Sequence, residues 1–113
     1  MSFGEQLIAW RRELHQNPEL SGQEVETTAR LRQWLTNAGI TPLPYELPTG
    51  LVAEIGAGKK LIALRADIDA LPVEERSGVA FSSQRAGVMH ACGHDGHTAM
   101  LLGAAALCRR RRR

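Results

Sequence analysis

The segment from Gly96 to Leu107, which reads GHTAMLLGAAAL, is apolar on every side and long enough to form a helix. A helix without a polar face has to be enclosed by other elements. The chain of 113 residues is sufficient for one small domain. Two further helices and a few short strands cannot easily enclose this one. We therefore interpret the chain as the front part of a larger domain that is cut off after the helix.

Two helices are predicted near the start of the chain. A capping-box spacing at Ser2 precedes apolar residues at helical intervals, which predicts a helix from Phe3 to His15 that stops before Pro18. The same capping-box spacing recurs at Ser21, ahead of a second periodic stretch. Gly39 is placed to cap the C-terminal end of that second helix.

Two apolar runs in the middle of the chain are typical of β-strands. Leu51 to Ile55 and Leu61 to Ala66 flank Gly56 to Lys59, which has the composition of a hairpin turn. The second run, LIALRA, is nearly all apolar, so we expect it in a sheet that is covered on both faces. Helices layered on such a sheet define an α/β fold class.

Charge and composition exclude several classes of partner. Five of the 14 basic residues form the run Arg109 to Arg113, and the remaining nine face 12 acidic residues. We therefore expect no nucleic-acid or membrane-surface face in the body of the chain, and a disordered tail over 109–113. No segment is typical of a spanning helix or a signal peptide. With two cysteines, we expect reduced thiols and a cytoplasmic location.

Three of the four histidines and one of the two cysteines fall between His90 and His97. Thiolate and imidazole are the ligands that zinc prefers, so the cluster predicts a metal site. Cys92 and His94 can point the same way only where the segment is not yet helical, and Gly93 permits a tight path just before the helix. Two ligands cannot close a four-coordinate site. The alternative is a small buried cysteine with histidines that flank the following helix.

A second polar cluster, Arg65 to Pro72, follows the strand that we expect to be buried. Sites collect at the C-terminal ends of strands in α/β sheets. Asp67 and Asp69 would be costly to bury at that edge without a cation or Arg65 as a partner. The cluster therefore favours a functional site, and the alternative is an internal Arg–Asp pair that only ends the strand.

Three segments, RRELHQNPELSGQEVETT, ALRADIDALP and GVMHACGHDGHTAMLLGAA, together resemble a family of metallo-amidohydrolases. This family includes hippurate hydrolase, bacterial N-acyl-amino-acid amidohydrolases and indole-acetyl-amino-acid hydrolases. The resemblance covers about residues 8 to 107. It implies that residues 1–108 are the N-terminal part of a helix-covered sheet domain of the zinc-dependent exopeptidase type. It also implies two divalent metal ions, zinc or manganese, and a bridging water that attacks an amide carbonyl.

Several residues of this chain match the motifs of that family by position. Cys92 and His94 match two of its metal ligands. Asp67 matches the aspartate that supports the site from the strand end, and Arg65 stands where related aminopeptidases have a histidine. The resemblance therefore implies that the Cys92 thiolate replaces one histidine ligand.

Other residues in the motifs match no ligand. We expect Asp69 and His97 to support the ligands from behind, and Asp95 to start the helix. The family's glutamate pair, which supplies the general base, and two further histidines have no counterpart in these 113 residues. Glu74 and Glu75 are the only adjacent glutamates, and we expect them in a solvated loop upstream of the metal cluster.

The resemblance implies an enzyme by descent, which hydrolyses the amide bond of N-acyl or N-aroyl amino acids. The resemblance implies a small-molecule substrate as the partner and, for the full-length family, a homo-oligomeric assembly. We expect the 113-residue chain itself to be inactive, because the general base is missing. Two alternatives stay open. One is a Cys92 nucleophile activated by a nearby histidine, and the other is a metal-binding fragment with no catalysis of its own.

Overall fold

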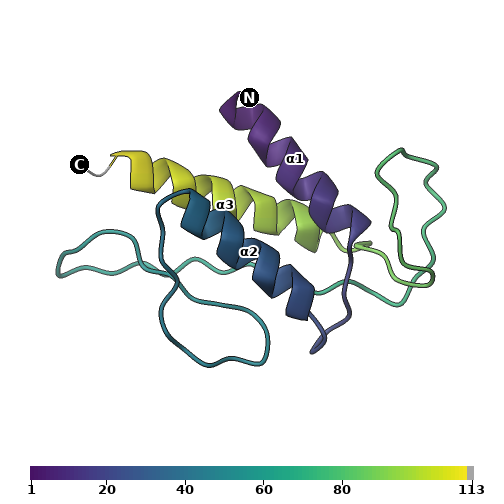
Figure 1. Cartoon of the computed structure of the whole chain (residues 1–113), viewed down its shortest axis with the longest axis horizontal. Helices are drawn as coiled ribbons and strands as arrows, with labels where there is room; N and C mark the ends of the chain where they lie inside the picture. Colours follow the sequence, from purple (N-terminus) through teal and green to yellow (C-terminus); the bar gives the residue numbers. More distant parts are fainter. Residues whose placement is uncertain (112–113) are drawn as a thin grey trace.

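The computed structural model describes residues 1–111 as three helices joined by long extended segments. Helix α1 spans Phe3–Gln16, α2 spans Val25–Asn37 and α3 spans His94–Arg111. In Figure 1 the helices lie beside one another, with α3 next to both α1 and α2, and the connecting segments loop out on either side. The most extensive helix packing is between α1 and α3, which are the first and last elements of the chain.

Local sequence signals explain where α1 and α2 begin. The capping box at Ser2 is confirmed, because its hydroxyl accepts a hydrogen bond from the Glu5 amide at 3.1 Å. The second helix is also confirmed, but the expected cap at Ser21 is wrong. The carboxylate of Glu19 instead accepts the hydrogen bond of the Thr27 amide at 2.6 Å in the first turn of α2. A carboxylate with two acceptor oxygens can satisfy amides at a helix start from a distance in sequence.

The three helices share one core of aliphatic side chains and alanines. Trp10 stacks on Trp34 with ring centroids 5.9 Å apart, which joins α1 to α2. Leu14, only 2% exposed, is among the most enclosed residues of the core. The buried core residues are Trp10, Leu14, Leu31, Leu35, Ile40, Ala99, Leu102 and Ala106.

The two strands and the hairpin expected over residues 51–66 are not formed within residues 1–111. The segments run extended without a ladder, and the described residues contain only two isolated bridges, Leu20 with Ala70 and Leu71 with Met89. The run expected to be buried on both faces is instead open, with Ile62 86% exposed. A strand is stabilised by pairing and by covered faces, and no described segment pairs with it. The sheet expectation is therefore wrong for the chain taken by itself.

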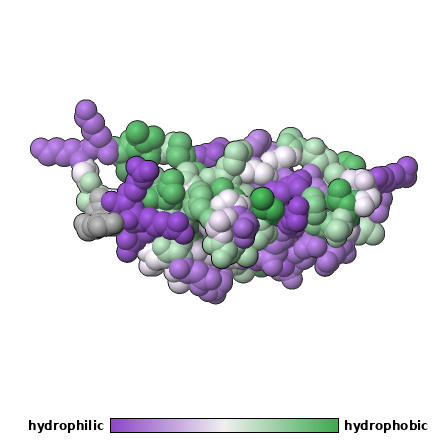
Figure 2. All heavy atoms as spheres, turned by 90° about the horizontal axis from the view of Figure 1, so that it is seen from above, coloured by the Kyte–Doolittle hydropathy of each residue, from purple (hydrophilic) through white to green (hydrophobic). Residues whose placement is uncertain are grey.

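Helix α3 confirms the predicted apolar helix but is enclosed on one face only. Met100 is 61% exposed and Leu107 is 38% exposed. The space-filling view in Figure 2 shows hydrophobic atoms at the surface among the hydrophilic ones. The helix continues through Arg111, three residues into the arginine run expected to be disordered, and Arg109 donates a hydrogen bond to the Gly39 carbonyl at 3.1 Å. Residues 112 and 113 lie outside the described part.

Cations near the last turn of a helix interact favourably with its carbonyl end, which fits the helical arginines at the end of α3.

Within residues 1–111, no helix combines the length and apolar character that crossing a bilayer requires.

Candidate metal centre

Backbone pairing brings the two polar clusters of the sequence together. Leu71 and Met89 exchange hydrogen bonds in an antiparallel bridge, with N···O distances of 2.9 and 3.0 Å. Nearby, the Thr98 hydroxyl on α3 donates a hydrogen bond to the backbone carbonyl of Asp67 at 3.0 Å. The segment that contains Asp67 therefore lies against the first turns of α3, which carry His94 and His97 of the histidine cluster.

His94 is the first residue of α3, and its ring is held by Asp69. Its Nδ1 lies 2.9 Å from the Asp69 backbone oxygen and 2.9 Å from the Asp69 carboxylate oxygen Oδ1. Since a carbonyl oxygen only accepts hydrogen bonds, Nδ1 has to carry the proton. In the neutral ring the lone pair then resides on Nε2. Histidines that bind metals have this form, in which one ring nitrogen binds the metal and the other donates a hydrogen bond to a carboxylate or carbonyl oxygen.

Cys92 lies two residues before His94, in a non-helical segment. Gly93 has a φ of +89°, in the left-handed region that favours glycine, and α3 begins directly after it. The predicted break between Cys92 and the helix is therefore confirmed. Both Cys92 and Cys108 are free thiols and exposed. In the part of the chain that the structure describes, no three His, Cys, Asp or Glu side chains converge as a metal site would need.

The other residues of the two motifs take different positions. The carboxylate of Asp67 pairs with the guanidinium of Arg65, at 3.0 Å between Nη2 and Oδ1, and its side chain is 48% exposed. This is the exposed form of the Arg–Asp pair that the sequence left open as an alternative. His97 is exposed on α3. Of the two aspartates, Asp69 is the one whose carboxylate contacts a predicted ligand.

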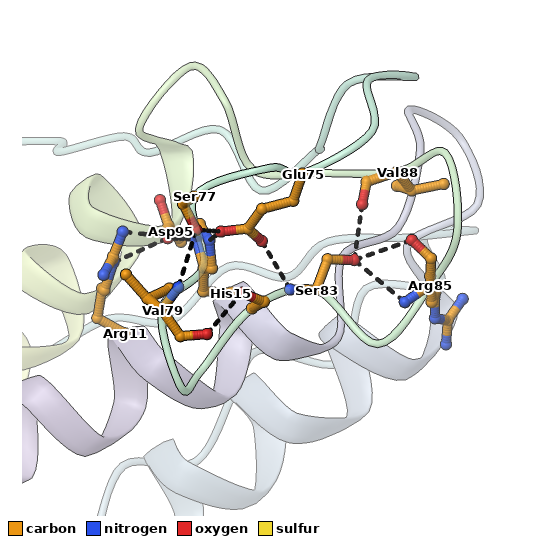
Figure 3. Close-up of polar contacts among 10 residues, drawn as sticks. Arg11, His15, Glu75, Ser77, Val79, Ser83, Arg85, Val88 and Asp95 are labelled. Atoms are coloured by element: carbon orange, nitrogen blue, oxygen red, sulfur yellow. Dashed lines mark hydrogen bonds and ion pairs between the residues drawn. The ribbon is translucent and has the colours of Figure 1, made fainter.

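A buried polar network lies beside this site (Figure 3). The ring of His15, at the end of α1, is placed between two carboxylates: Nδ1 is 2.7 Å from Asp95 Oδ2, and Nε2 is 2.9 Å from Glu75 Oε2. Arg11 Nε donates a second hydrogen bond to the same Asp95 oxygen at 2.9 Å. The side chains of His15, Glu75 and Asp95 are 4%, 3% and 1% exposed. The network therefore ties α1, the loop at residue 75 and the first turn of α3 together.

The expectation that Glu75 sits in a solvated loop is wrong. Its carboxylate also accepts hydrogen bonds from the Ser77 hydroxyl and the Ser83 amide, both at 2.6 Å. Burial raises the pKa of Glu75, but these hydrogen bonds, together with the hydrogen bond and charge of His15, outweigh it and lower the pKa from its ordinary 4.5 to about 2. Glu75 is therefore a fixed and buried carboxylate, whereas Glu74 is exposed and accepts one hydrogen bond, from the Gly87 amide.

His90 is a further buried histidine close to this region. It is 4% exposed, and neither ring nitrogen has a hydrogen-bond partner within the described residues. Burial lowers the pKa of His90, and the carboxylate of Asp95 opposes that shift. The buried ring of His90 is therefore favoured in its neutral form.

Sequence reasoning assigned Asp95 only to the helix start and did not find His15 or Arg11. One local signal was available, because Arg11 and His15 are four residues apart and therefore share a face of α1. A basic pair beside buried Trp10 and Leu14 indicates that an acidic partner has to be buried with it. The identity of that partner was not readable, since Glu75 and Asp95 are 60 and 80 residues away.

Comparisons with known proteins identify relatives of this chain. The sequence profile of Peptidase family M20/M25/M40 matches residues 63–113. The chain is 56% identical over 104 residues to the N-acetyl-L-cysteine deacetylase of Bacillus subtilis, covering 90% of this chain and 25% of that protein. It is 48% identical over 101 residues to the N-acyl-L-amino acid amidohydrolase of Geobacillus stearothermophilus, covering 88% of this chain and 27% of that protein.

A crystal structure of a Bacillus subtilis protein, described as a dinuclear metal binding peptidase from the M20 family, matches with a TM-score of 0.93. The two chains are 50% identical, and the match covers 97% of this chain and 32% of the other. The chain belongs to this family of metal-dependent amidohydrolases and peptidases, which confirms the resemblance found in the sequence. Its fold is part of an M20 peptidase fold, and the chain spans a quarter to a third of the length of these relatives.

Proposed function

We propose that this chain supplies part of the metal centre of an amidohydrolase that acts on N-acyl amino acids. The named activities of its relatives, deacetylation of N-acetyl-L-cysteine and hydrolysis of N-acyl-L-amino acids, support this substrate class. The proposed partner is accordingly a small-molecule substrate, with neither nucleic acid nor membrane involved, in a cytoplasmic protein that assembles as a homo-oligomer.

The observation that carries the proposal is the fixed tautomer of His94. Two Asp69 oxygens, each 2.9 Å from Nδ1, hold the proton on that nitrogen and leave the lone pair of Nε2 available to bind a metal. Both hydrogen bonds described for His94 within residues 1–111 use Nδ1. A histidine with only a structural role at the start of α3 would not need a carboxylate oxygen and a carbonyl oxygen that both contact the same ring nitrogen.

The residues present fit two of the donors of a metal site. His94 would offer its Nε2 and Cys92 its exposed sulfur as a thiolate. A soft thiolate together with an imidazole suits zinc, and manganese is the alternative. When bound, a divalent metal polarises the amide carbonyl and lowers the pKa of the attacking water. Asp69 keeps His94 in the metal-binding tautomer, and Asp67, two residues before it in the chain, is the proposed supporting carboxylate.

The same residues do not supply a general base. Both oxygens of Glu75 are engaged by His15, Ser77 or Ser83, and its side chain is only 3% exposed, so this carboxylate is poorly placed to take a proton from an attacking water. Removing a general base costs roughly 10²- to 10⁴-fold in rate. We therefore expect the 113-residue chain alone not to hydrolyse hippurate or other N-acyl amino acids, even with added metal.

A chimera tests the proposed function. Residues 1–107 of this chain would replace the matching segment of the Bacillus subtilis deacetylase, and metal-dependent hydrolysis of N-acetyl-L-cysteine would be followed by the release of acetate or of the free α-amino group. We expect the chimera to be active, the Cys92→Ser and His94→Ala chimeras to lose at least about tenfold, and the Glu74→Gln chimera to match its parent. A folded chimera that is inactive, or one that keeps full activity with Cys92→Ser, would contradict the proposal.

A further inference from the structure

The buried network around His15 lies one residue from the proposed ligand His94. Asp95 follows His94 directly in the first turn of α3, and its side chain is 1% exposed. A carboxylate so deeply buried is costly unless it is fully paired. Here the same oxygen, Oδ2, meets Nδ1 of His15 at 2.7 Å and Nε of Arg11 at 2.9 Å. Asp95 therefore fixes the first turn of α3 onto α1.

His15 is in turn fixed on its other side. Its Nε2 lies 2.9 Å from Glu75 Oε2, and the Phe81 ring packs edge-on with centroids 5.8 Å apart. With a carboxylate on each ring nitrogen, rotation of the imidazole would break two hydrogen bonds at once. Glu75 itself is held by Ser77 and Ser83. Figure 3 shows His15, Glu75 and Asp95 converging from α1, the loop and the start of α3.

We propose that Glu75, His15 and Asp95 are positioning residues, which hold the first turn of α3 so that His94 and Cys92 face a shared metal. This inference rests on the proposed function. Two aspartates then fix the position of His94: Asp69 sets the orientation of its ring, and Asp95 sets the position of the backbone in the first turn of α3. Charge supports the arrangement, because two carboxylates face the guanidinium of Arg11 and the imidazole of His15 inside a nearly closed site.

A purely structural role for the network makes a different prediction. If it only stabilised the fold, a substitution at Glu75 would lower the free energy of unfolding and leave the metal affinity of the folded chain unchanged. If it positions the ligands, metal affinity falls while the helices remain formed. Groups behind a metal ligand typically contribute 10- to 100-fold in affinity.

Cobalt binding separates these roles. The 113-residue chain in a Cys108→Ser background would be titrated with CoCl₂, following the thiolate-to-cobalt charge-transfer absorption, with helix content measured by circular dichroism in the same samples. We expect Glu75→Gln and His15→Gln to raise the cobalt dissociation constant about tenfold with the helices retained. Glu74→Gln, a matched change at an exposed neighbour, should leave it unchanged.

The outcomes are distinguishable. Dissociation constants of folded Glu75→Gln and His15→Gln within about twofold of the parent would overturn the positioning role, whatever their thermal midpoints. If His15→Gln does not fold, Glu75→Gln decides the question, since glutamine keeps the size and shape of the side chain but removes the charge that faces His15 and replaces one acceptor oxygen with a donor. A parent chain without any charge-transfer band, or a band that survives Cys92→Ser, would instead overturn the proposed metal site itself.

Discussion

Glu75 provides a test of the structure that needs no metal. Its pKa of about 2 in the folded chain lies below the ordinary 4.5, so its ionised form stabilises the fold. That contribution is present above about pH 4.5 and is lost as the pH falls from 4.5 toward 2. The substitution Glu75→Gln removes the titrating group while it preserves the size and shape of the side chain.

The magnitude follows from the pKa shift. Each pKa unit corresponds to about 1.4 kcal/mol, so a decrease from 4.5 to about 2 sets an upper limit of about 3 kcal/mol. The residues on either side of Glu75 are exposed, and solvent screening reduces the expected value to about 1 to 2 kcal/mol. More than half of this contribution should disappear between pH 6 and pH 3.

The assay is urea unfolding followed by circular dichroism at a series of pH values. The parent chain should lose about 1 kcal/mol more stability between pH 6 and pH 3 than the Glu75→Gln chain. Glu74→Gln should follow the parent, because that side chain is exposed and glutamine keeps an oxygen that can accept the hydrogen bond of the Gly87 amide. Identical pH dependence of the parent and the Glu75→Gln chain would refute the argument that Glu75 is a buried, strongly hydrogen-bonded carboxylate.

Three further substitutions test the packing. Leu14→Ala should lower the free energy of unfolding by about 2 to 5 kcal/mol, because Leu14 is 2% exposed, whereas Ile8→Ala, at a 53% exposed position, should cost far less in the same denaturation experiment. Gly103→Leu should destabilise the chain by about 1 to 3 kcal/mol, since even a Cβ there would overlap Leu7 of α1, and an unchanged thermal midpoint would argue against this helix contact. Glu19→Ala should cost about 1 kcal/mol and speed amide exchange in the first turn of α2, and unaltered exchange would exclude the cap.

The helices were predictable because their signals are local. The cap at Ser2 and the apolar spacing that follows lie within one or two turns, and no distant residue is needed to read them. The cap of α2 was missed because it comes from Glu19. The carboxylate of Glu19 accepts a hydrogen bond from the Thr27 amide, which is eight residues later in the chain. The strand prediction was wrong for another reason. LIALRA has the composition of a strand, but a strand needs neighbouring strands to pair with, and residues 1–111 do not provide them.

The candidate site was only partly predictable for the same physical reason. Cys92 and His94 are close in sequence, so their ligand chemistry could be read directly. The choice between Asp67 and Asp69 depends on which face of the chain meets α3, and the structure places the Asp69 carboxylate on His94. The roles of Cys92, His94 and Asp67 as metal-site residues stay predictions. The His15 network joins residues 60 to 80 apart, which no local pattern reports.

The central claim is that Cys92 and His94 bind one metal ion together, and zinc X-ray absorption tests it most directly. The zinc-loaded Cys108→Ser chain should show one sulfur at about 2.3 Å and one imidazole nitrogen at about 2.0 to 2.1 Å. Cys92→Ser should remove the sulfur, and His94→Ala should remove the imidazole. A zinc environment of oxygen and nitrogen only in the Cys108→Ser chain would contradict the account.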